Sequence, residues 1–364
     1  MSNLPSPKQT LKIIDGMLPD YVVKKVEERL LAYKEGFADN TNRARAADYR
    51  VFKTWCDKNG LRPVPSTPED IERFMWERVQ QKKVDKITGE VKLKKDGKPI
   101  YEQIKAVATV ERNLATIKYM HDVSYEVMQD LTDPYENAAK LKNPADTRRV
   151  RIALRAIKRK FRSKAQRQAA PIRLDLMEEI ISTLTDSLRH TLYKALVSVA
   201  FDSMMRCSEL VNIDLDHITF EDDGSAKVLV PFHKSDQEGE GSYRYLSSTS
   251  VTLIHNWITM AHIEEGLLFR SVNKANDVLD SMHKDRVAKI YKVIARLCGF
   301  KASTISAHST RVGAAQELVT FGATMPELML AGDWKSSAMP VRYAKKINVD
   351  KGAMATMSKV RGRS

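Results

Sequence analysis

The sequence predicts a mainly α-helical protein with two domains. Apolar residues recur at a period close to 3.6 over most of the chain, which is typical of packed helices, and strand-like alternation is found at residues 212–245. The length of 364 residues is enough for two domains, each with its own core. The division that we expect is a flexible arm at 1–18, a helical domain at 19–162, a small polar linker at 163–171, a second domain at 172–346 and a tail at 347–364.

The composition indicates the kind of partner. Lysine and arginine number 60 against 46 aspartates and glutamates, so the net charge is +14, which predicts a polyanionic partner. No apolar run approaches the length of a membrane helix, and the first residues lack the layout of a signal peptide. We therefore expect a cytoplasmic protein without a membrane partner. The three scattered cysteines fit a reducing compartment, and no histidine or cysteine spacing predicts a metal site.

Five helices are expected in the first domain. Their predicted bounds are from Pro19 onward, from about Asn40 to Lys58, from Ser66 to Gln81, from Tyr101 to Val123 and from Asp146 to Arg162. Asn40 is expected to cap the second helix. Val23 and Leu31 of the first helix and Ile152 of the fifth are expected to face inward, because they belong to apolar stripes at helical spacing.

Two strongly basic segments lie in or beside this domain. Residues 82–99 hold seven lysines and an Asp96-Gly97 turn signal, which predicts a surface hairpin. This hairpin is either simply solvated or an additional contact to a nucleic-acid backbone. Residues 148–167 hold ten lysines and arginines and no acid, with apolar residues between them. One side of this helix can therefore pack while the other meets phosphates.

The second domain is expected to begin with a helix from Asp175, capped together with Glu178. An apolar core helix is predicted from Leu192 to Met205, followed by the strands of 212–245. Further helices are predicted at 249–261 and 283–298, with Leu297 of the last one facing inward.

Residues 308–343 concentrate groups that bind and attack phosphate, and they read HSTRVGAAQELVTFGATMPELMLAGDWKSSAMPVRY. His308 and Arg311 are three residues apart, which places them on one face of a helix. Arginine can hold two phosphate oxygens at once, and histidine and the indole of Trp334 add further donors. Tyr343 can act as a nucleophile if its neighbours stabilise the phenolate. Each residue alone is more often structural, but their combination favours attack of a tyrosine on a phosphodiester.

This segment and the stretch MMRCSEL at 204–210 resemble the tyrosine recombinases, the phage-type integrases. The resemblance implies a two-domain DNA clamp with an N-terminal helical bundle. It also implies a helical C-terminal catalytic domain with a small three-stranded antiparallel sheet, and no metal or cofactor. Lys234 best matches the lysine of the sheet hairpin, and Lys227 is the alternative. The catalytic residues that the resemblance implies are Arg206, Glu209, Lys234, His308, Arg311, Trp334 and Tyr343.

The same resemblance implies a mechanism and an assembly. Tyr343 would form a 3′-phosphotyrosine bond, and strand exchange would pass through a Holliday junction. Four copies of the chain would act on two DNA sites with inverted repeats, and the tail at 347–364 would dock into a neighbouring subunit. Arg286 would enter the major groove, where it either reads guanine or contacts a phosphate.

The basic residues that we expect to contact DNA are Arg43, Arg45, Arg50, Lys53, Arg112, Lys118, Arg155, Arg159, Lys284 and Arg286. Two other kinds of enzyme remain open, a hairpin telomere resolvase and a type IB topoisomerase, because both use a similar set of residues. A DNA-binding protein that has lost catalysis and a helical RNA-binding protein are the non-enzymatic alternatives. The RNA-binding alternative explains the charge but not the ordered His308, Trp334 and Tyr343.

Overall fold

The computed structural model describes residues 20–85, 88–94, 96–131, 142–161, 168–231, 241–344, 357–358 and 360–362. The chain divides into two compact units, residues 1–167 and residues 168–364. The division falls inside the predicted linker at 163–171, whose first five residues lie outside the described ranges. The predicted arm at 1–18 and most of the predicted tail at 347–364 also lie outside them.

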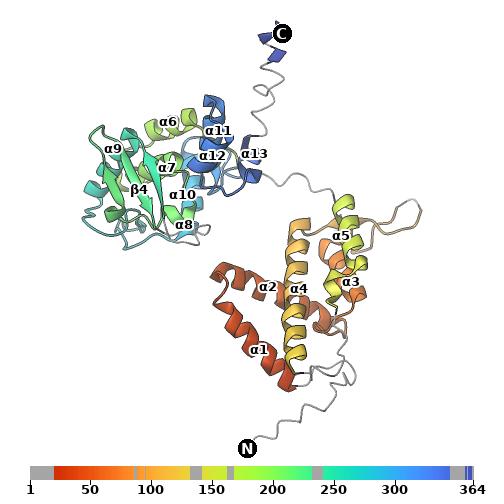
Figure 1. Cartoon of the computed structure of the whole chain (residues 1–364). Helices are drawn as coiled ribbons and strands as arrows, with labels where there is room; N and C mark the ends of the chain where they lie inside the picture. The colour runs from red at the N-terminus through yellow and green to blue at the C-terminus, as the bar shows by residue number, and fades with distance from the viewer. Residues whose placement is uncertain are drawn as a thin grey trace, which may run out of the picture. The chain divides into compact units, whose positions relative to one another are not determined.

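The first unit is a bundle of helices, as predicted (Figure 1). Its helices are α1 (Asp20–Lys34), α2 (Asp39–Lys58), α3 (Pro68–Val79), α4 (Val107–Leu131) and α5 (Arg148–Lys160). The long α4 contacts all of the other four. The main core includes Phe52 and Phe74, whose ring centroids lie 4.9 Å apart edge to face. Burying each of these rings stabilises the bundle by roughly 1.5–3 kcal/mol.

Two short strands displace the predicted helix ends in this unit. Strand β1 (Gln80–Lys82) pairs with β2 (Tyr101–Gln103), so α3 ends at Val79 and α4 begins only at Val107. The hairpin predicted at 82–99 is confirmed, because bridges join Val84 to Val91 and Leu93 to Pro99. At its turn Gly97 adopts a φ of 76°, which glycine tolerates without strain.

Several local predictions for helix ends and faces were wrong. Helix α2 begins at Asp39 without a side-chain cap, so Asn40 is not its cap, and α5 is capped by Thr147 rather than starting at Asp146. Helix α1 packs through the buried Val22 and Val26, with Leu30 and Tyr33 partly buried against the same cluster. The apolar residues that are exposed instead of inward are Val23, Leu31, Ile152 and Leu297.

The second unit is mainly helical with one small sheet, which confirms the predicted fold class (Figure 1). Its helices are α6 (Leu174–Thr183), α7 (Leu188–Asp202), α8 (Cys207–Leu210), α9 (Ser248–Met260), α10 (Lys284–Leu297), α11 (Ser309–Phe321), α12 (Met325–Ala331) and α13 (Ala338–Ala344). Strands β3 (Ile218–Phe220), β4 (Ala226–Val230) and β5 (Ser242–Leu246) form an antiparallel sheet in that order. The core centres on large buried side chains such as Trp257 and Tyr291.

The apolar helix α7 ends earlier than predicted, so a turn separates its last residue from Arg206. It runs from Leu188 to Asp202 instead of from Leu192 to Met205. The turn that follows contains Met204 with a φ of 50°, a left-handed conformation that costs a residue with a side chain roughly 1 kcal/mol or more. The predicted cap at Asp175 was also wrong, since Arg173 occupies the N-cap of α6.

Close backbone packing positions α11 against the start of this unit. A Cβ on Gly313 would lie 1.7 Å from the carbonyl oxygen of Ile172, so only glycine fits there. The backbone N–H of Ile172 donates to the carbonyl of Ser309 at 2.9 Å. The helix that carries Arg311 is therefore fixed at its N-terminal end by the incoming chain.

Candidate active site

Arg206 lies at the start of α8, where Glu209 holds both its main chain and its side chain. The Glu209 carboxylate accepts a hydrogen bond from the Arg206 backbone N–H at 2.8 Å and from Nη1 at 2.7 Å. The Glu209 side chain is 8% exposed, against 31% for Arg206. Burial lowers the pKa of Arg206, but its contacts with Glu209 and Asp333 raise it above the ordinary value. The guanidinium is therefore charged and fixed in orientation.

Arg311 lies in the first turn of α11 and is buried, with 4% of its surface exposed. Its guanidinium donates to the backbone carbonyls of Met204 and Gly332. These two residues precede Arg206 and Trp334 by two positions each. Arg311 therefore connects, through these hydrogen bonds, the turn before Arg206 and the turn before Trp334. Burial, and after it the charge of Arg206, lowers the pKa of Arg311 to about 10.

Trp334 lies against Arg311, and Tyr343 meets the Trp334 ring edge to face. The Cζ atom of Arg311 lies 4.5 Å from the centroid of the Trp334 ring, and that ring lies 5.8 Å from the ring of Tyr343 at an interplanar angle of 63°. Tyr343 is 7% exposed, and the side-chain amide of Gln316 donates to its backbone carbonyl at 3.2 Å. The predicted nucleophile therefore lies next to two of the predicted phosphate donors.

His308 occupies the N-cap position of α11, one helical turn before Arg311. Its backbone N–H donates to the hydroxyl of Ser306 at 3.2 Å. Although the residue keeps an exposed surface, partial desolvation of the imidazole, followed by the positive charges of Arg311 and Arg206, lowers the pKa of His308. A neutral imidazole can accept a proton from a neighbouring group, which is the property that a general base requires.

Of the two candidates for the lysine of the sheet hairpin, the structure describes only Lys227. Lys234 lies outside the described residues. Lys227 is 58% exposed, and its ammonium lies 2.8 Å from the carboxylate of Glu221. It pairs in register with Tyr245, on the face of the sheet opposite to the buried side chain of Arg244. Lys227 therefore points away from the side of the sheet on which Arg244 meets Asp333.

Sequence reasoning missed Arg244 and Asp333. Arg244 lies on β5 and is 8% exposed, and its Nη2 lies 3.8 Å from Oδ2 of Asp333. The same Oδ2 atom accepts from Nη1 of Arg206 at 3.3 Å. One signal was available for Arg244, because it occupies an inward position of the strand and a buried charge there requires a partner. Asp333 carried no such signal.

Three of the predicted DNA contacts in the first unit are engaged within the protein. Arg112 donates to both oxygens of Asp48, at 2.7 and 2.9 Å, and Asp48 is only 3% exposed. Lys118 pairs with Asp146 at 2.8 Å, and Lys53 pairs with Asp57 at 3.0 Å. The Arg112 pair satisfies a buried carboxylate, so it supports the bundle whatever its role toward DNA.

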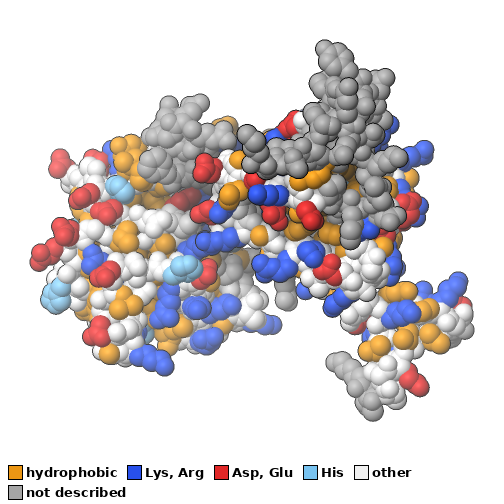
Figure 2. Space-filling model, turned by 90° about the horizontal axis from the view of Figure 1, so that it is seen from below, with side chains coloured by type: hydrophobic (Ala, Val, Ile, Leu, Met, Phe, Trp, Pro, Cys, Tyr) orange, Lys and Arg blue, Asp and Glu red, His pale blue; other side chains and the backbone are white. Residues whose placement is uncertain are grey.

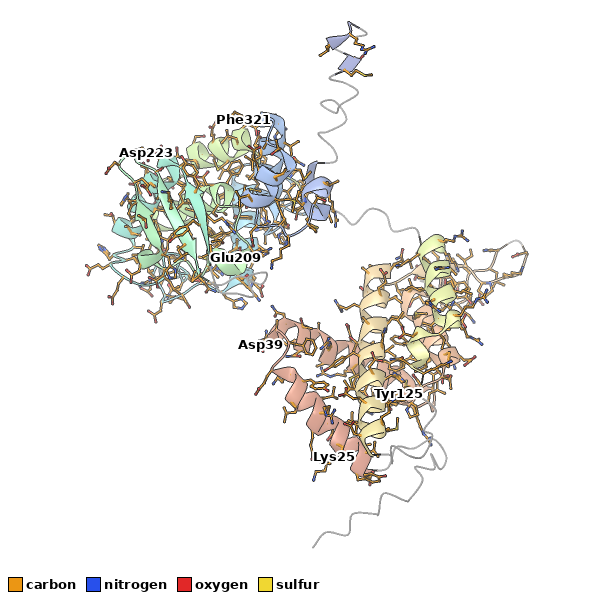
Figure 3. The ribbon with its side chains drawn as sticks, in the orientation of Figure 1. Lys25, Asp39, Tyr125, Glu209, Asp223 and Phe321 are labelled. Atoms are coloured by element: carbon orange, nitrogen blue, oxygen red, sulfur yellow. The ribbon has the colours of Figure 1, made fainter. Side chains whose placement is uncertain are left out.

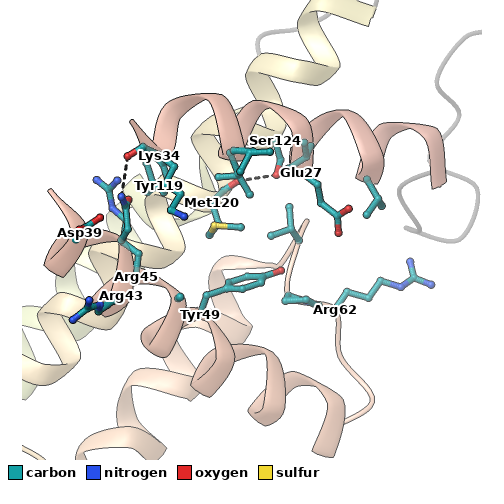
Figure 4. A pocket seen from close by; sticks show the side chains of 18 residues that line it. Glu27, Lys34, Asp39, Arg43, Arg45, Tyr49, Arg62, Tyr119, Met120 and Ser124 are labelled. Carbon is teal, nitrogen blue, oxygen red and sulfur yellow. Dashed lines mark hydrogen bonds between the residues drawn. The ribbon is translucent and has the colours of Figure 1, made fainter. Parts of the chain in front are cut away.

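Arg45 is held between two aromatic rings. Its Cζ atom lies 3.9 Å from the ring centroid of Phe37 and 3.8 Å from that of Tyr119. It lines a cavity of about 980 Å³ bordered by α1, α2 and α4, together with Arg43 and Tyr49 (Figure 4). Nη1 of Arg45 is buried and has no hydrogen-bond partner within the described part of the chain. Its contact with DNA stays a prediction.

Five of the six remaining basic candidates are at the surface. Arg43, Arg50, Arg155, Arg159 and Arg286 are exposed, whereas Lys284 is half-buried at the start of α10. Figure 2 shows lysine and arginine side chains gathered on the face of the second unit that is turned to the viewer. Such a surface attracts phosphate groups, although each contact with a base or phosphate stays a prediction.

Over the described ranges, no cluster of histidine, cysteine, aspartate and glutamate is arranged to hold a metal ion. Within the same ranges, no helix is long and apolar enough to cross a membrane. Cys56, Cys207 and Cys298 are free thiols. Burial raises the pKa of Cys56 to about 12 and that of Cys207 to about 11, so both thiols are protonated at neutral pH.

Comparison with known proteins identifies the class. Residues 172–348 match the phage integrase family. The chain is 26% identical over 329 residues to an integrase/recombinase XerD homologue of Selenomonas ruminantium, covering 86% of this chain and 84% of the relative. It is 21% identical over 377 residues to the recombinase Cre of Escherichia phage P1, covering 98% of each. Residues 172–348 therefore form a domain of the phage integrase family, the family of the tyrosine recombinases, and the predicted resemblance to the tyrosine recombinases is confirmed.

Solved structures show the same fold. The Tn1549 transposon integrase in complex with circular intermediate DNA has a TM-score of 0.58 at 12% identity, covering 92% of this chain and 99% of that one. A lambda integrase dimer bound to a core site has a TM-score of 0.51 at 13% identity, covering 90% and 95%. At these identities the likeness concerns the fold alone.

Proposed function

We propose that this protein is a site-specific DNA recombinase in which Tyr343 attacks the scissile phosphate. The observation that carries the proposal is the convergence of Arg206, Arg311, Trp334 and Tyr343. They come, in that order, from the N-cap of α8, from α11, from the turn between α12 and α13, and from α13. No single local structure requires these four to meet. A site that binds the phosphate in DNA and places a phenol beside it accounts for the arrangement.

The first chemical step replaces one ester by another. The Tyr343 Oη forms a bond to phosphorus while the bond from phosphorus to the 5′ oxygen breaks, which leaves a 3′-phosphotyrosine. Negative charge spreads over the non-bridging oxygens in the transition state, and Arg206, Arg311 and the Trp334 N–H stabilise it there. Losing one preorganised donor of this kind typically costs about 3–4 kcal/mol of barrier.

Two proton transfers accompany this step. Phenols in general titrate near pH 10, so the nucleophile needs a base, and the neutral His308 takes its proton. We assign the proton donor for the departing 5′ oxygen to Lys234, and to Glu209 the task of holding Arg206 in place. No external energy source is needed, because the new ester conserves the energy of the old one.

Strand exchange follows when a 5′ hydroxyl of a partner strand attacks the phosphotyrosine. Two such rounds pass through a Holliday junction and require four copies of the chain on two sites with inverted repeats. We propose that the two units clamp the duplex and that the tail at 347–364 docks into a neighbouring copy. The Tn1549 and lambda integrase relatives are described with bound DNA, which supports a DNA partner here.

The experiment begins by finding the DNA site. The full chain is incubated in EDTA with a pool of random-sequence duplexes that carry nicks, and DNA that remains attached under denaturing conditions is sequenced. The recovered duplex is then tested on a denaturing gel with wild type, Tyr343→Phe and Tyr193→Phe. Tyr193 is a buried tyrosine of α7 and serves as the matched control.

We expect covalent adducts from wild type and from Tyr193→Phe, and none from Tyr343→Phe. Recombinant product from two copies of the site favours a recombinase, whereas relaxation of supercoils alone favours a topoisomerase and closed hairpin ends favour a telomere resolvase. Tight DNA binding without any adduct on nicked DNA would refute catalysis and leave a DNA-binding protein.

A further inference from the structure

Two carboxylates contact Arg206, and their geometries differ. Glu209 accepts from the Arg206 backbone N–H and Nη1 at 2.8 and 2.7 Å. Asp333 accepts from Nη1 at 3.3 Å through its side chain and from Nη2 at 3.4 Å through its backbone carbonyl. Charge-assisted hydrogen bonds are typically about 2.7–2.9 Å long, so the bonds to Glu209 are strong and those to Asp333 are weak.

The Asp333 carboxylate also lies near a second arginine. Nη2 of Arg244 lies 3.8 Å from Oδ2 of Asp333, the same oxygen that Arg206 contacts. Arg244 is 8% exposed, and its Nη1 donates to the carbonyl of Tyr243 at 3.1 Å. Burial lowers the pKa of Arg244, an effect that Asp333 and Glu209 oppose. One oxygen of Asp333 thus lies between two guanidinium groups.

The backbone of Asp333 directs its side chain to this position. Its φ of 49° is left-handed, a conformation that aspartate tolerates better than most residues with a Cβ. Its neighbours on both sides belong to the site, because the carbonyl of Gly332 binds Arg311 and the ring of Trp334 stacks on it. A carboxylate there places a negative charge where the proposed function places a phosphate.

We propose that Asp333 is a displaceable counter-ion and that Arg244 is a further cation of the phosphate pocket. Without DNA the Asp333 carboxylate occupies the space between Arg206 and Arg244. The scissile phosphate displaces it, takes over the guanidinium N–H groups of Arg206 and Arg244 that lie 3.3 and 3.8 Å from it, and leaves the short bonds between Arg206 and Glu209 intact. This inference rests on the proposed function, since it names two more residues of the same site.

Opposite effects follow for the two residues. Asp333→Asn keeps the size of the side chain and the tolerance for a left-handed backbone, but it removes the competing charge, so inorganic phosphate should bind about tenfold more tightly. Arg244→Gln removes one donor, so phosphate should bind about tenfold more weakly. Arg244→Lys keeps the charge on a single ammonium group and should lie between wild type and Arg244→Gln.

The first test does not depend on catalysis. A ligand that binds only the folded protein raises the melting temperature according to its affinity. The full chain and its variants are melted in increasing inorganic phosphate and, separately, in sodium chloride of equal ionic strength. Asp223→Asn is the control, because it removes an exposed carboxylate of the β3–β4 turn, which Figure 3 shows on the opposite side of this unit from Glu209.

The second test measures the rate of adduct formation on the recovered duplex at low DNA concentration. Asp333→Asn should raise this rate about tenfold and Arg244→Gln should lower it about tenfold, with Asp223→Asn like wild type. Weaker phosphate binding by Asp333→Asn would overturn the proposal and make Asp333 a positioning residue of Arg206. Unchanged phosphate binding by Arg244→Gln would remove Arg244 from the pocket.

The two tests separate this inference from the proposed function. If wild type forms no adduct while the variants shift phosphate affinity as expected, the proposed function fails and the counter-ion stands. If wild type forms adducts but the variants do not shift phosphate affinity, the inference fails and the proposed function stands.

Discussion

Replacing Gly332 by alanine tests whether the contacts of Trp334 with Arg311 and Tyr343 are needed for the reaction. A Cβ at this position would lie 2.1 Å from Cζ3 and 2.3 Å from Cε3 of the Trp334 ring. Carbon atoms in contact lie about 3.5 Å apart, so the ring has to move by about 1.4 Å. Because the ring lies on Arg311 and beside Tyr343, both contacts change when it moves.

The size of the effect follows from this displacement. Forcing an extra methyl group into a packed site typically costs about 1–3 kcal/mol of stability. A misplacement of about 1 Å at a reacting centre can lower the rate roughly 100-fold. We therefore expect Gly332→Ala to remain folded, to melt several degrees lower than wild type, and to form the covalent adduct roughly 100-fold more slowly.

The assay is adduct formation on the nicked duplex under single-turnover conditions, with circular dichroism to confirm folding. Gly36→Ala is the matched control, since a Cβ there would meet only the Tyr33 carbonyl at an ordinary 3.5 Å. An adduct rate for Gly332→Ala within twofold of wild type would refute the reasoning. The Trp334 ring would then have been displaced without slowing the reaction, so its position would not be required.

Three further outcomes are expected. The pKa of His308 is lowered, so the folded state binds fewer protons than the unfolded state. The contribution of His308 to stability is complete above about pH 6.5 and decreases below it. This decrease in melting temperature should be absent from His308→Gln. Asp48→Asn should destabilise the first unit by roughly 1–2 kcal/mol in urea unfolding, a value discounted because Arg112 is largely exposed. Cys207, with a pKa raised to about 11, should react with iodoacetamide at pH 8 far more slowly in the folded protein than in urea.

The fold class could be predicted because helical periodicity is a local property of the sequence. The five helices of the first unit and the sheet of the second lie where apolar spacing placed them. Helix ends were less accurate, since β1 and β2 pair residues that are far apart in the chain, and this pairing shortened α3 and delayed α4. A pattern read within one segment contains no information about such a distant partner.

The site shows the same division. The types and spacing of five residues resemble those of a known family, so the sequence could propose them: Arg206, His308, Arg311, Trp334 and Tyr343. Contacts link Arg311, Trp334 and Tyr343 and the turn before Arg206, and the catalytic roles of all five stay predictions. The roles of Asp333 and Arg244 could not be predicted, because they depend on a contact between two residues that lie 89 positions apart in the sequence.

Two left-handed turns in the candidate site are held by hydrogen bonds from the buried Arg311. Met204 and Asp333 both hold a conformation that is costly for residues with side chains, with φ values of 50° and 49°. The first lies two residues before Arg206, and the second lies directly before Trp334. Arg311 binds the carbonyl of Met204 itself and the carbonyl of Gly332, next to Asp333. Arg311, which was predicted to bind phosphate, therefore also stabilises these two turns, and it holds the predicted donors Arg206 and Trp334 in place without DNA.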